Sequence, residues 1–497
     1  MIHMSAAAAK LIGVDIGAES GRVMVGHLDG DHLKLEELRR FSTGAVRVGE
    51  GLFTDVLHIW GEIQSGLAQA AARYGDQIAS VGVDTWGVDC ALLDANGSLL
   101  SNPRHYRDPR TQGMLEKAFA RVPREEIYHQ TGNQFEVFNT LYQLLATAEY
   151  EPDLLSAAHS LLMLPDLFHY WLSGERACEY TDATTTQCYN QRAQDWAWDL
   201  LEKFSLPARL FGPIAQPGSS LGGLVPYLAE STGCAKNVRV ILPASHDTGS
   251  AVTAIPVTEP DFLYISSGTW SLVGVELAQP VITPASLALN FTNEGSPQGR
   301  IRFLRNVPGM WLLQQCRQAW AQQGRSYTYG ELTELAEAVP ADGALIDVAD
   351  ASFRSPGDMP ARIRTYCRNT GQPQPESEGA VTRRLLESLA CQYRALLEEF
   401  ERLLGRPMRT IHIIGGGARN RLLNQMTADC TSRRVVAGPY EATAAGNVLV
   451  QAMGLGYLHT VEDIRRVVRH SFEPESYHPV PSVYWEDCYQ RYRKLVG

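Results

Sequence analysis

Residues 15–22, Asp-Ile-Gly-Ala-Glu-Ser-Gly-Arg, combine a carboxylate with two glycines, a pattern that could bind a phosphate and its metal ion. Glycines let backbone N–H groups come close to a phosphate. The next residues, RVMVGHL, alternate like a strand, whereas a P-loop or a Rossmann fingerprint requires a helix there. We therefore expect the phosphate on a hairpin turn, with Asp15 binding Mg²⁺ directly or through water. The alternative is that Gly17 and Gly21 only build the turn.

A second hairpin pattern, FLYISSGTWSLVGVEL over residues 262–277, carries hydroxyl groups where the first carries a carboxylate. Hydroxyl and backbone donors suit the γ-phosphate of a nucleotide, whereas a second buried carboxylate would repel it. We expect the first hairpin to bind the metal ion and the second to donate hydrogen bonds. The alternative is an ordinary turn rich in Ser and Thr.

Three consecutive glycines, residues 415–417, follow the buried strand pattern THII and precede a predicted helix. Without side chains they allow the backbone to approach a flat group such as adenine. The lysine of a P-loop is missing, which disfavours a phosphate role. The alternative is close packing of the strand against the helix.

His246-Asp247-Thr248-Gly249 lies at the end of a predicted strand over residues 238–245, where open α/β sheets bind ligands. Phosphoryl transfer to a hydroxyl requires positioning, neutralisation of charge and a group that accepts the hydroxyl proton. Asp247 suits that last role, because the N-terminus of a helix would keep it ionised. The alternative is that Asp247 only caps the helix.

Residues 84–89, Asp-Thr-Trp-Gly-Val-Asp, join an aromatic ring, a glycine and two carboxylates. A sugar could stack on the ring while the carboxylates accept hydrogen bonds from its hydroxyl groups. The alternative is a core Trp beside structural aspartates. Further polar contacts could come from the following loop, which is otherwise a solvated segment: His105, Tyr106, Arg107, Asp108 and Arg110.

The strands and helices that position these residues are predicted to alternate along the chain. This alternation indicates an α/β protein. Helical periodicity dominates residues 113–205, 308–323 and 379–404. The two hairpins lie about half the chain apart, which indicates a duplicated architecture, with coincidence as the alternative. Prolines and small residues cluster at 251–261, so we expect an N-terminal domain over residues 1–251 and a C-terminal domain over 252–497.

The composition is that of a globular protein, with 44% hydrophobic and 20% charged residues and a net charge of −11. No long basic run and no apolar stretch of about 20 residues is present, so we expect neither nucleic acid nor a membrane as partner. The lead-in MIHMSAAAAK does not have the pattern of a signal peptide. Nine scattered cysteines without a C-x-x-C pair favour free thiols in the cytoplasm. A monomer is compatible with the sequence.

Five segments, taken in order, resemble the FGGY carbohydrate kinases over nearly the whole chain: VDIGAESGR, GVDTWGVD, ASHDT, ISSGTWS and IIGGGARN. Within that family, YRDPRT, FNTLYQL, EYTDATTTQ and GGGARNRLLNQ are most similar to the branch that phosphorylates rhamnulose. The resemblance implies two ribonuclease-H-like domains of the actin-type ATPase fold, with ATP in the cleft between them. It also implies a small ketose as the second substrate.

The resemblance further implies a role for particular residues. Asp247 would accept the proton of the C1 hydroxyl of rhamnulose. The residues expected to contact ATP are Ala18, Glu19, Ser20, Gly21, Arg22, Thr269, Gln314 and Gly416. The residues expected to line the sugar site are Gly87, His246, Asp247, Thr248 and Asn306. Asn306 belongs to a run, Asn-x-x-Gly-x-Trp, that the family also shows.

Three other hypotheses remain open at this point. The acceptor could be another ketose, such as fuculose or xylulose. The chain could be an actin-like ATPase acting on a protein partner, although such an enzyme needs neither the DTWGVD segment nor a base at Asp247. It could also be an inactive sugar sensor, against which the presence of Asp15 and Asp247 argues.

Overall fold

A computed structural model describes residues 9–341 and 343–497, which divide into two compact units. The first unit comprises the chain up to residue 256 together with residues 276–304 and 442–471. The second comprises residues 257–275, 305–441 and 472–497. This partition differs from a single division at 251/252, because two later segments pack onto the first unit. The alanine-rich residues before Ala9 lie outside the described part of the chain.

The first unit contains a six-stranded sheet in the order β13-β14-β6-β1-β2-β3. Strands β1, β2 and β3 form an antiparallel meander, β6 and β14 run parallel to β1, and β13 is antiparallel to β14. The bounds are β1 Ala9–Ile16, β2 Ser20–Asp29, β3 His32–Ser42, β6 Ile78–Thr85, β13 Ser220–Gly223 and β14 Arg239–Ile241. The predicted first hairpin is confirmed, with its turn at residues 17–19.

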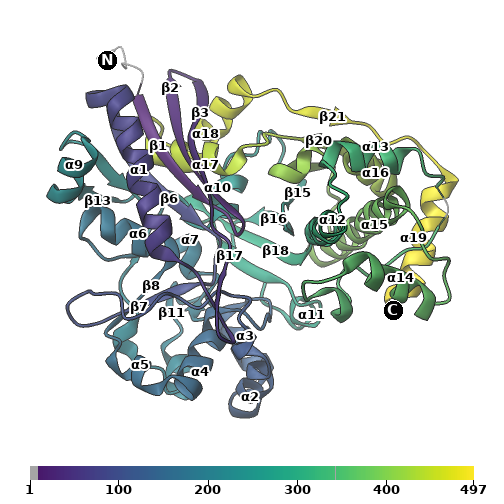
Figure 1. The fold of residues 1–497 in the computed structure, drawn as a ribbon, viewed down its shortest axis with the longest axis horizontal. Helices are drawn as coiled ribbons and strands as arrows, with labels where there is room; N and C mark the ends of the chain where they lie inside the picture. Colours follow the sequence, from purple (N-terminus) through teal and green to yellow (C-terminus); the bar gives the residue numbers. More distant parts are fainter. Residues whose placement is uncertain (1–8, 342) are drawn as a thin grey trace. The chain divides into compact units, whose positions relative to one another are not determined.

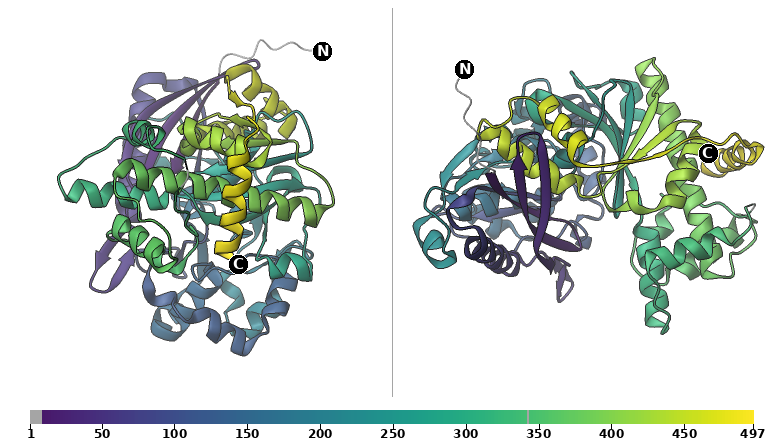
Figure 2. Two further views of the ribbon diagram at one scale, coloured as in Figure 1. Left: turned by 90° about the vertical axis from the view of Figure 1, so that its right-hand side faces the viewer. Right: turned by 90° about the horizontal axis from the view of Figure 1, so that it is seen from above.

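Two helices cover this sheet on opposite faces (Figures 1 and 2): α1 (Val56–Tyr74) and α17 (Ala442–Gly454). Gly66 of α1 packs against Val23, whereas Val448 of α17 lies over Gly26. Residues 23 and 26 of one strand point to opposite faces, because side chains alternate along a strand. A Cβ atom at Gly26 would lie 2.9 Å from Val448 Cγ2, so the missing side chain allows α17 to approach.

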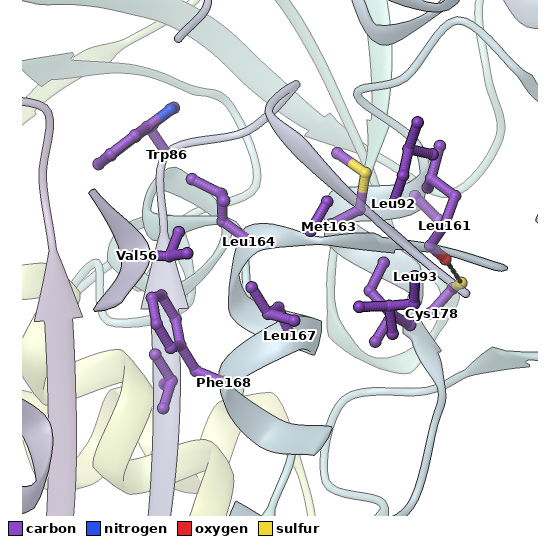
Figure 3. Close-up of a cluster of buried hydrophobic side chains, with 14 of the residues drawn as sticks. Val56, Trp86, Leu92, Leu93, Leu161, Met163, Leu164, Leu167, Phe168 and Cys178 are labelled. Atoms are coloured by element: carbon purple, nitrogen blue, oxygen red, sulfur yellow. Dashed lines mark hydrogen bonds between the residues drawn. The ribbon is translucent and has the colours of Figure 1, made fainter. Parts of the chain in front are cut away.

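Short helices and two-stranded ribbons follow β6, as the helical periodicity of residues 113–205 predicts. The ribbon of β7 (Cys90–Leu93) and β8 (Ser160–Met163) packs with α6 (Leu164–Ser173) around the apolar core shown in Figure 3. The other helices here are α2 Met114–Arg121, α3 Arg124–Thr131, α4 Thr140–Tyr150, α5 Pro152–Ala157, α7 Tyr180–Ala183, α8 Trp198–Lys203 and α9 Pro226–Thr232. The other ribbons are β4 Val46–Val48 with β5 Gly51–Phe53, β9 Cys178–Glu179 with β12 Ile214–Ala215, and β10 Tyr189–Asn190 with β11 Asp195–Trp196.

The remaining elements of the first unit come from later in the chain. They are α10 Asp247–Thr253, α11 Pro284–Ala288, β17 Thr292–Gly295, the first half of β18 (Ile301–Pro308) and α18 Val461–Ser471. Strands β17 and β18 are antiparallel, with Glu294 opposite Arg302.

The second unit is built on a sheet that contains β18, β16, β15, β19, β20 and β21 in that order. The bounds are β15 Phe262–Ser267, β16 Trp270–Leu277, β19 Thr410–Ile414, β20 Arg434–Ala437 and β21 Glu475–Tyr477. The helices are α12 Trp311–Gln322, α13 Tyr329–Glu337, α14 Met359–Asn369, α15 Glu378–Leu404, α16 Arg421–Thr431 and α19 Val483–Val496. The helices predicted at 308–323 and 379–404 and the second hairpin are confirmed.

The duplicated architecture is visible in the strand pairing. Strand β15 is antiparallel to β16 and parallel to β19, as β1 is antiparallel to β2 and parallel to β6. Strand β19 is in turn parallel to β20, as β6 is to β14. Each glycine-containing hairpin therefore occupies the same place in its own sheet.

All nine cysteines are free thiols, and three of them meet in the second unit. Cys391 of α15 lies with its Sγ 3.7 Å from that of Cys488 in α19 and 4.0 Å from that of Cys430 in α16. All three are buried, so this cluster belongs to the packing of the three helices.

Candidate active site

The turn of the first hairpin is short and presents backbone donors. Gly17 N–H donates to Ser20 O at 3.1 Å, and the Thr43 hydroxyl donates to Gly17 O at 2.6 Å. Among the hydrogen bonds of the described residues, none uses the N–H groups of Ala18 and Glu19. These two donors are therefore available to an anion at the tip of the turn.

Asp15 and Arg22 face each other across the base of this hairpin. The two residues are paired in the β1–β2 ladder, and their side chains form a largely buried ion pair. On the other side of β1, Asp15 is the register partner of Asp84 in β6. The structure thus places the predicted metal ligand between a guanidinium group and a second carboxylate.

Asp15, Asp84 and Asp247 form a group of three interacting carboxylates in the first unit. Complete burial raises the pKa of Asp84 well above its usual value, and the charges of Asp15 and Asp247 raise it further. Burial also raises the pKa of Asp247, while His246 opposes the shift and Asp15 adds to it. Within residues 9–341 and 343–497, no group of three or more potential ligands has the geometry of a metal centre.

Asp247 is the first residue of α10, and its side chain is 30% exposed. The N-cap of this helix is His246, so Asp247 is not the capping residue that the alternative requires. Its Oδ1 accepts hydrogen bonds from the backbone N–H and, at 3.0 Å, from the hydroxyl of Thr248. A carboxylate whose pKa is raised and whose side chain is partly accessible has the properties of a general base.

His246 connects Asp247 to two buried residues of the β17–β18 hairpin. Its Nε2 lies 3.5 Å from Asp247 Oδ1, and its Nδ1 lies 3.4 Å from Glu294 Oε2 and 3.1 Å from a terminal nitrogen of Arg302. Reasoning from the sequence missed Glu294 and Arg302. They belong to no short motif, and only the strand pairing brings them together and onto His246.

Gly87 lies in a tight turn against Thr185, where a Cβ atom would lie 2.9 Å from the Thr185 methyl group. The next residue, Val88, has a φ of 72°, a conformation that is a real outlier for a β-branched residue. It is held there by hydrogen bonds from Thr140 and Gln143 to its carbonyl group and by its N–H donating to Thr185 Oγ1. Such strain concentrates at functional sites.

Trp86 and Asp89, by contrast, fit the structural alternative. Trp86 is buried at the edge of the core in Figure 3, and its Nε1 donates to Asp89 Oδ2 at 3.0 Å. Asp89 is fully buried, and this burial raises its pKa to about 7 although Trp86, Gln143 and Tyr106 donate to it. The expected stacking of a sugar on Trp86 is therefore not supported.

The loop that follows is not a solvated segment. His105, Tyr106 and Asp108 are all buried, and the rings of His105 and Tyr106 stack with centroids 4.4 Å apart. Burial lowers the pKa of His105 to about 4, so this imidazole is neutral at physiological pH.

The turn of the second hairpin resembles that of the first but is one residue shorter, since Ser267 pairs with Ser271 whereas Ile16 pairs with Gly21. Gly268 N–H donates to Trp270 O at 2.9 Å, and none of the hydrogen bonds of the described residues is donated by Thr269. Gly309 packs directly on this turn, since a Cβ atom there would lie 2.9 Å from Gly268 O. The run from Asn306 to Trp311 therefore brings the start of α12 against the second hairpin.

Among the buried side-chain polar atoms of the second unit for which the described residues provide no hydrogen bond are Gln314 Oε1, in the first turn of α12, and Ser267 Oγ, at the end of β15. Gly416 and Gly417 differ in the space around their Cβ positions. A Cβ atom at Gly417 would lie 2.1 Å from Ser267 Oγ, so close packing explains this glycine, whereas nothing lies within 4 Å of a Cβ atom at Gly416. The space at Gly416 and the unpartnered Gln314 Oε1 are compatible with the ATP contacts expected of these two residues.

The sugar-site residues predicted from the sequence fall in both units. Gly87, His246, Asp247 and Thr248 belong to the first unit, where the end of β6 pairs with residue 246 in a parallel bridge between Thr85 and His246. Asn306 lies in the second half of β18 and belongs to the second unit.

Two sequence profiles cover most of the chain. The N-terminal domain of the FGGY family of carbohydrate kinases matches residues 10–254, and the C-terminal domain of that family matches residues 263–455. The chain belongs to the FGGY family of carbohydrate kinases. An ATPase that acts on a protein partner is thereby set aside, because the family consists of enzymes that phosphorylate carbohydrates.

Relatives in this family cover nearly the whole chain. A rhamnulokinase of Bacteroides thetaiotaomicron is 44% identical over 483 residues, covering 97% of this chain and 98% of that protein. A rhamnulokinase of Oceanobacillus iheyensis is 41% identical over 466 residues, covering 94% of this chain and 97% of that protein.

Solved structures of FGGY kinases share the fold. The gluconate kinase of Lactobacillus acidophilus matches with a TM-score of 0.79 at 17% identity, covering 98% of both chains. The xylulose kinase of Rhodospirillum rubrum matches with a TM-score of 0.79 at 20% identity, also covering 98% of both chains. The expectation of two α/β domains of the actin-type ATPase fold is confirmed. In the described part of the chain, no helix has the length and apolarity needed to span a bilayer.

Proposed function

We propose that this protein transfers the γ-phosphate of ATP to the C1 hydroxyl of rhamnulose and that Asp247 accepts the hydroxyl proton. The substrate is supported by relatives named rhamnulokinase that are 40–44% identical to this chain over nearly its whole length. The observation that carries the mechanism is the partly exposed Asp247 carboxylate at the start of α10, with a raised pKa and His246 beside it.

The chemistry needs little covalent participation from the protein. The hydroxyl oxygen attacks the γ-phosphorus while its proton moves to Asp247, and the bond to the β-phosphate breaks to release ADP. The raised pKa of Asp247 makes it a better proton acceptor than an ordinary aspartate as long as it is ionised. An inactive sugar sensor would need no such base.

We propose that ATP is contacted by residues of both hairpins and of the α12 and glycine segments. The first hairpin offers the N–H groups of Ala18 and Glu19 together with Ser20, Gly21 and Arg22. Thr269 offers a second set of donors, the space at Gly416 suits the adenine, and Gln314 Oε1 offers an unpartnered acceptor. The described residues thus fit an adenine nucleotide.

We propose that Asp15 participates in binding Mg²⁺. Mg²⁺ needs only one or two protein carboxylates in addition to water and phosphate oxygens, so a cluster of three protein ligands is not required. When bound, it would neutralise charge on the transferred phosphoryl group. The ion pair between Asp15 and Arg22 orients this carboxylate.

We propose that Gly87, His246, Thr248 and Asn306 contact the sugar. The N–H and carbonyl groups of Val88 are used within the protein, so the strained turn would present the N–H group of Gly87 to a hydroxyl group of the sugar. All nine cysteines are free, which supports the proposal that the protein works in the reducing cytoplasm.

A coupled assay of ADP release over a panel of ketoses tests the substrate. We expect rhamnulose to give the highest kcat/KM, with fuculose and xylulose lower by at least about tenfold. Product analysis by ³¹P NMR would check that the phosphate is on C1. A higher kcat/KM for fuculose or xylulose would assign the enzyme to that ketose, and ADP release that no ketose stimulates would contradict kinase function.

A further inference from the structure

A buried network of charges lies behind His246. Arg302 of β18 is completely buried, and it stands directly opposite Glu294 of β17 in the antiparallel ladder. Its Nε donates to Gly295 O at 2.8 Å, one terminal nitrogen lies 3.3 Å from Glu294 Oε2, and the other lies 3.1 Å from His246 Nδ1. A buried guanidinium group is costly unless it is paired and hydrogen-bonded, so this arrangement requires a specific reason.

The contact with Arg302 defines the protonation of the imidazole ring. A guanidinium group has only donors, so Nδ1 of His246 must act as the acceptor in this contact. A neutral ring then carries its proton on Nε2, the nitrogen that lies 3.5 Å from Asp247 Oδ1.

Glu294 also lies near Nδ1, at 3.4 Å, but its interaction with Arg302 gives it a different role. Burial alone would favour the neutral acid, yet the surroundings of Glu294, which include His246 and the charge of Arg302, outweigh burial and lower its pKa. The ionised carboxylate balances the charge of Arg302 and holds the guanidinium group in place.

Within the described part of the chain, the polar contacts of the Asp247 carboxylate all involve one of its two oxygens. The Thr248 N–H, the Thr248 hydroxyl and His246 Nε2 all lie against Oδ1. Among the described residues, no hydrogen bond or ion pair involves Oδ2. The two carboxylate oxygens therefore have different functions available to them.

We propose that Arg302 and Glu294 are positioning residues that hold His246 as the Nε2–H tautomer, so that the imidazole and Thr248 engage Oδ1 of Asp247 and leave Oδ2 to accept the proton of the substrate hydroxyl. This inference rests on the proposed role of Asp247 as the base. The proton moves from the hydroxyl oxygen to Oδ2 as the new oxygen–phosphorus bond forms, and Oδ1 keeps its donors throughout. In the complex with substrate the 3.5 Å contact would shorten, as catalytic hydrogen bonds commonly do.

The tautomer can be read directly by NMR without substrate. Protein labelled with ¹⁵N in its histidine rings, with the His246 signals assigned by their loss in His246→Gln, should show a protonated Nε2 and an unprotonated Nδ1. In the double variant Glu294→Gln/Arg302→Gln, which leaves no buried charge unpaired, this preference should be lost. A wild-type ring that is protonated on Nδ1 would overturn the inference, and so would a preference unchanged in a folded double variant.

Kinetics of two His246 variants give an independent test. The amide nitrogen of Gln can reach the position of Nε2, whereas that of Asn lies near the position of Nδ1. We expect His246→Gln to keep kcat within about tenfold of wild type and His246→Asn to lose roughly 10²-fold or more, with thermal melts showing both folded. Equal kcat values for the two variants would contradict the role of an Nε2 donor.

The two proposals can fail separately. If the panel of ketoses identified another acceptor, the NMR and the comparison of Gln with Asn would still apply with that sugar. If rhamnulose were phosphorylated normally by a wild-type enzyme whose ring is protonated on Nδ1, the substrate assignment would stand and the positioning role would fall.

Discussion

Asn447 of α17 donates a hydrogen bond to the buried carboxylate of Asp84, which lies 363 residues earlier in the chain. Asp84 is in turn the register partner of Asp15 and interacts electrostatically with Asp247. Gln451, one turn further along α17, donates to Ile12 O at 2.9 Å and accepts from the Ser80 hydroxyl at 2.7 Å. The late segment 442–471 therefore completes the polar interior of the first unit beside the proposed base.

The first prediction concerns this link. Asn447→Leu should lower the free energy of unfolding by roughly 1–3 kcal/mol, because Asp84 and Gly82 O lose a donor inside the protein. Urea denaturation would measure the change. Thr443→Ala, at a partly exposed position of the same helix, should change stability by less than about 0.5 kcal/mol.

A second prediction concerns the close approach of α17 to α10. A Cβ atom at Gly446 would lie 1.8 Å from Ser250 O, so Gly446→Ala should force the two backbones apart and cost roughly 1–3 kcal/mol or more. Gly61→Ala in α1 is the matched control, since nothing lies within 4 Å of its Cβ position. That substitution should be neutral or stabilise by up to about 1 kcal/mol, and equal melting temperatures for the two variants would refute the packing argument.

A third prediction separates stability from nucleotide binding in the glycine segment. Gly416→Ala should leave the melting temperature unchanged, because space is open there, yet it should raise KM for ATP by roughly tenfold if the backbone contacts adenine. Gly417→Ala should instead lower the melting temperature through its clash with Ser267 Oγ. An unchanged KM for ATP in Gly416→Ala would remove this residue from the nucleotide site.

The fourth prediction concerns the base. Asp247→Asn should fold and bind ATP like the wild type but lower turnover by roughly 10²–10⁴-fold. In the wild type, the raised pKa of Asp247 means that activity falls on acidification at a higher pH than an ordinary aspartate would give. Rate–pH profiles and binding of ATP by calorimetry would check both statements, and wild-type turnover by Asp247→Asn would exclude it as the base.

The fifth prediction concerns stability and pH. Asp89 has a pKa raised to about 7 in the folded protein, against about 3.9 in an unfolded chain, so between these values the folded state binds more protons. Stability should therefore be lost as pH rises from about 4 to about 7, by up to about 4 kcal/mol from this residue. In Asp89→Asn the loss over this range should be smaller, whereas Asp153→Asn, at an exposed position, should leave it unchanged.

Short sequence patterns predicted the features that are formed by residues close together in the chain. Alternation, glycine positions and periodicity predicted both glycine hairpins, the strand and helix on either side of residues 415–417, and the placement of Asp247 at the start of a helix. The motifs around these residues also identified the family. The motifs could not reveal contacts that depend on pairing between residues far apart in the sequence. Arg302 stands opposite Glu294 in neighbouring strands, and both side chains lie against His246.

The other differences between the expectations from the sequence and the structure concern which residues are buried. From the sequence, Trp86 could equally be a surface on which a sugar stacks or a residue of the core. The structure shows that it is buried among apolar residues and belongs to the core. Likewise, the polar residues from His105 to Asp108 resemble a surface loop, yet His105, Tyr106 and Asp108 are buried. No spacing in the sequence indicates the positive φ of Val88, because a valine in that conformation is uncommon anywhere.

The position of α17 also has a consequence for synthesis on the ribosome. Strands β1, β2 and β6 emerge first, but the helix that covers one of their faces is encoded after residue 441. An N-terminal half that has just left the exit tunnel would expose that apolar face for the time needed to translate some two hundred further codons, which is tens of seconds at about 5–20 residues per second. Nascent chains halted before this helix should therefore be sensitive to protease and bound by chaperones, and both properties should disappear once translation has passed residue 471.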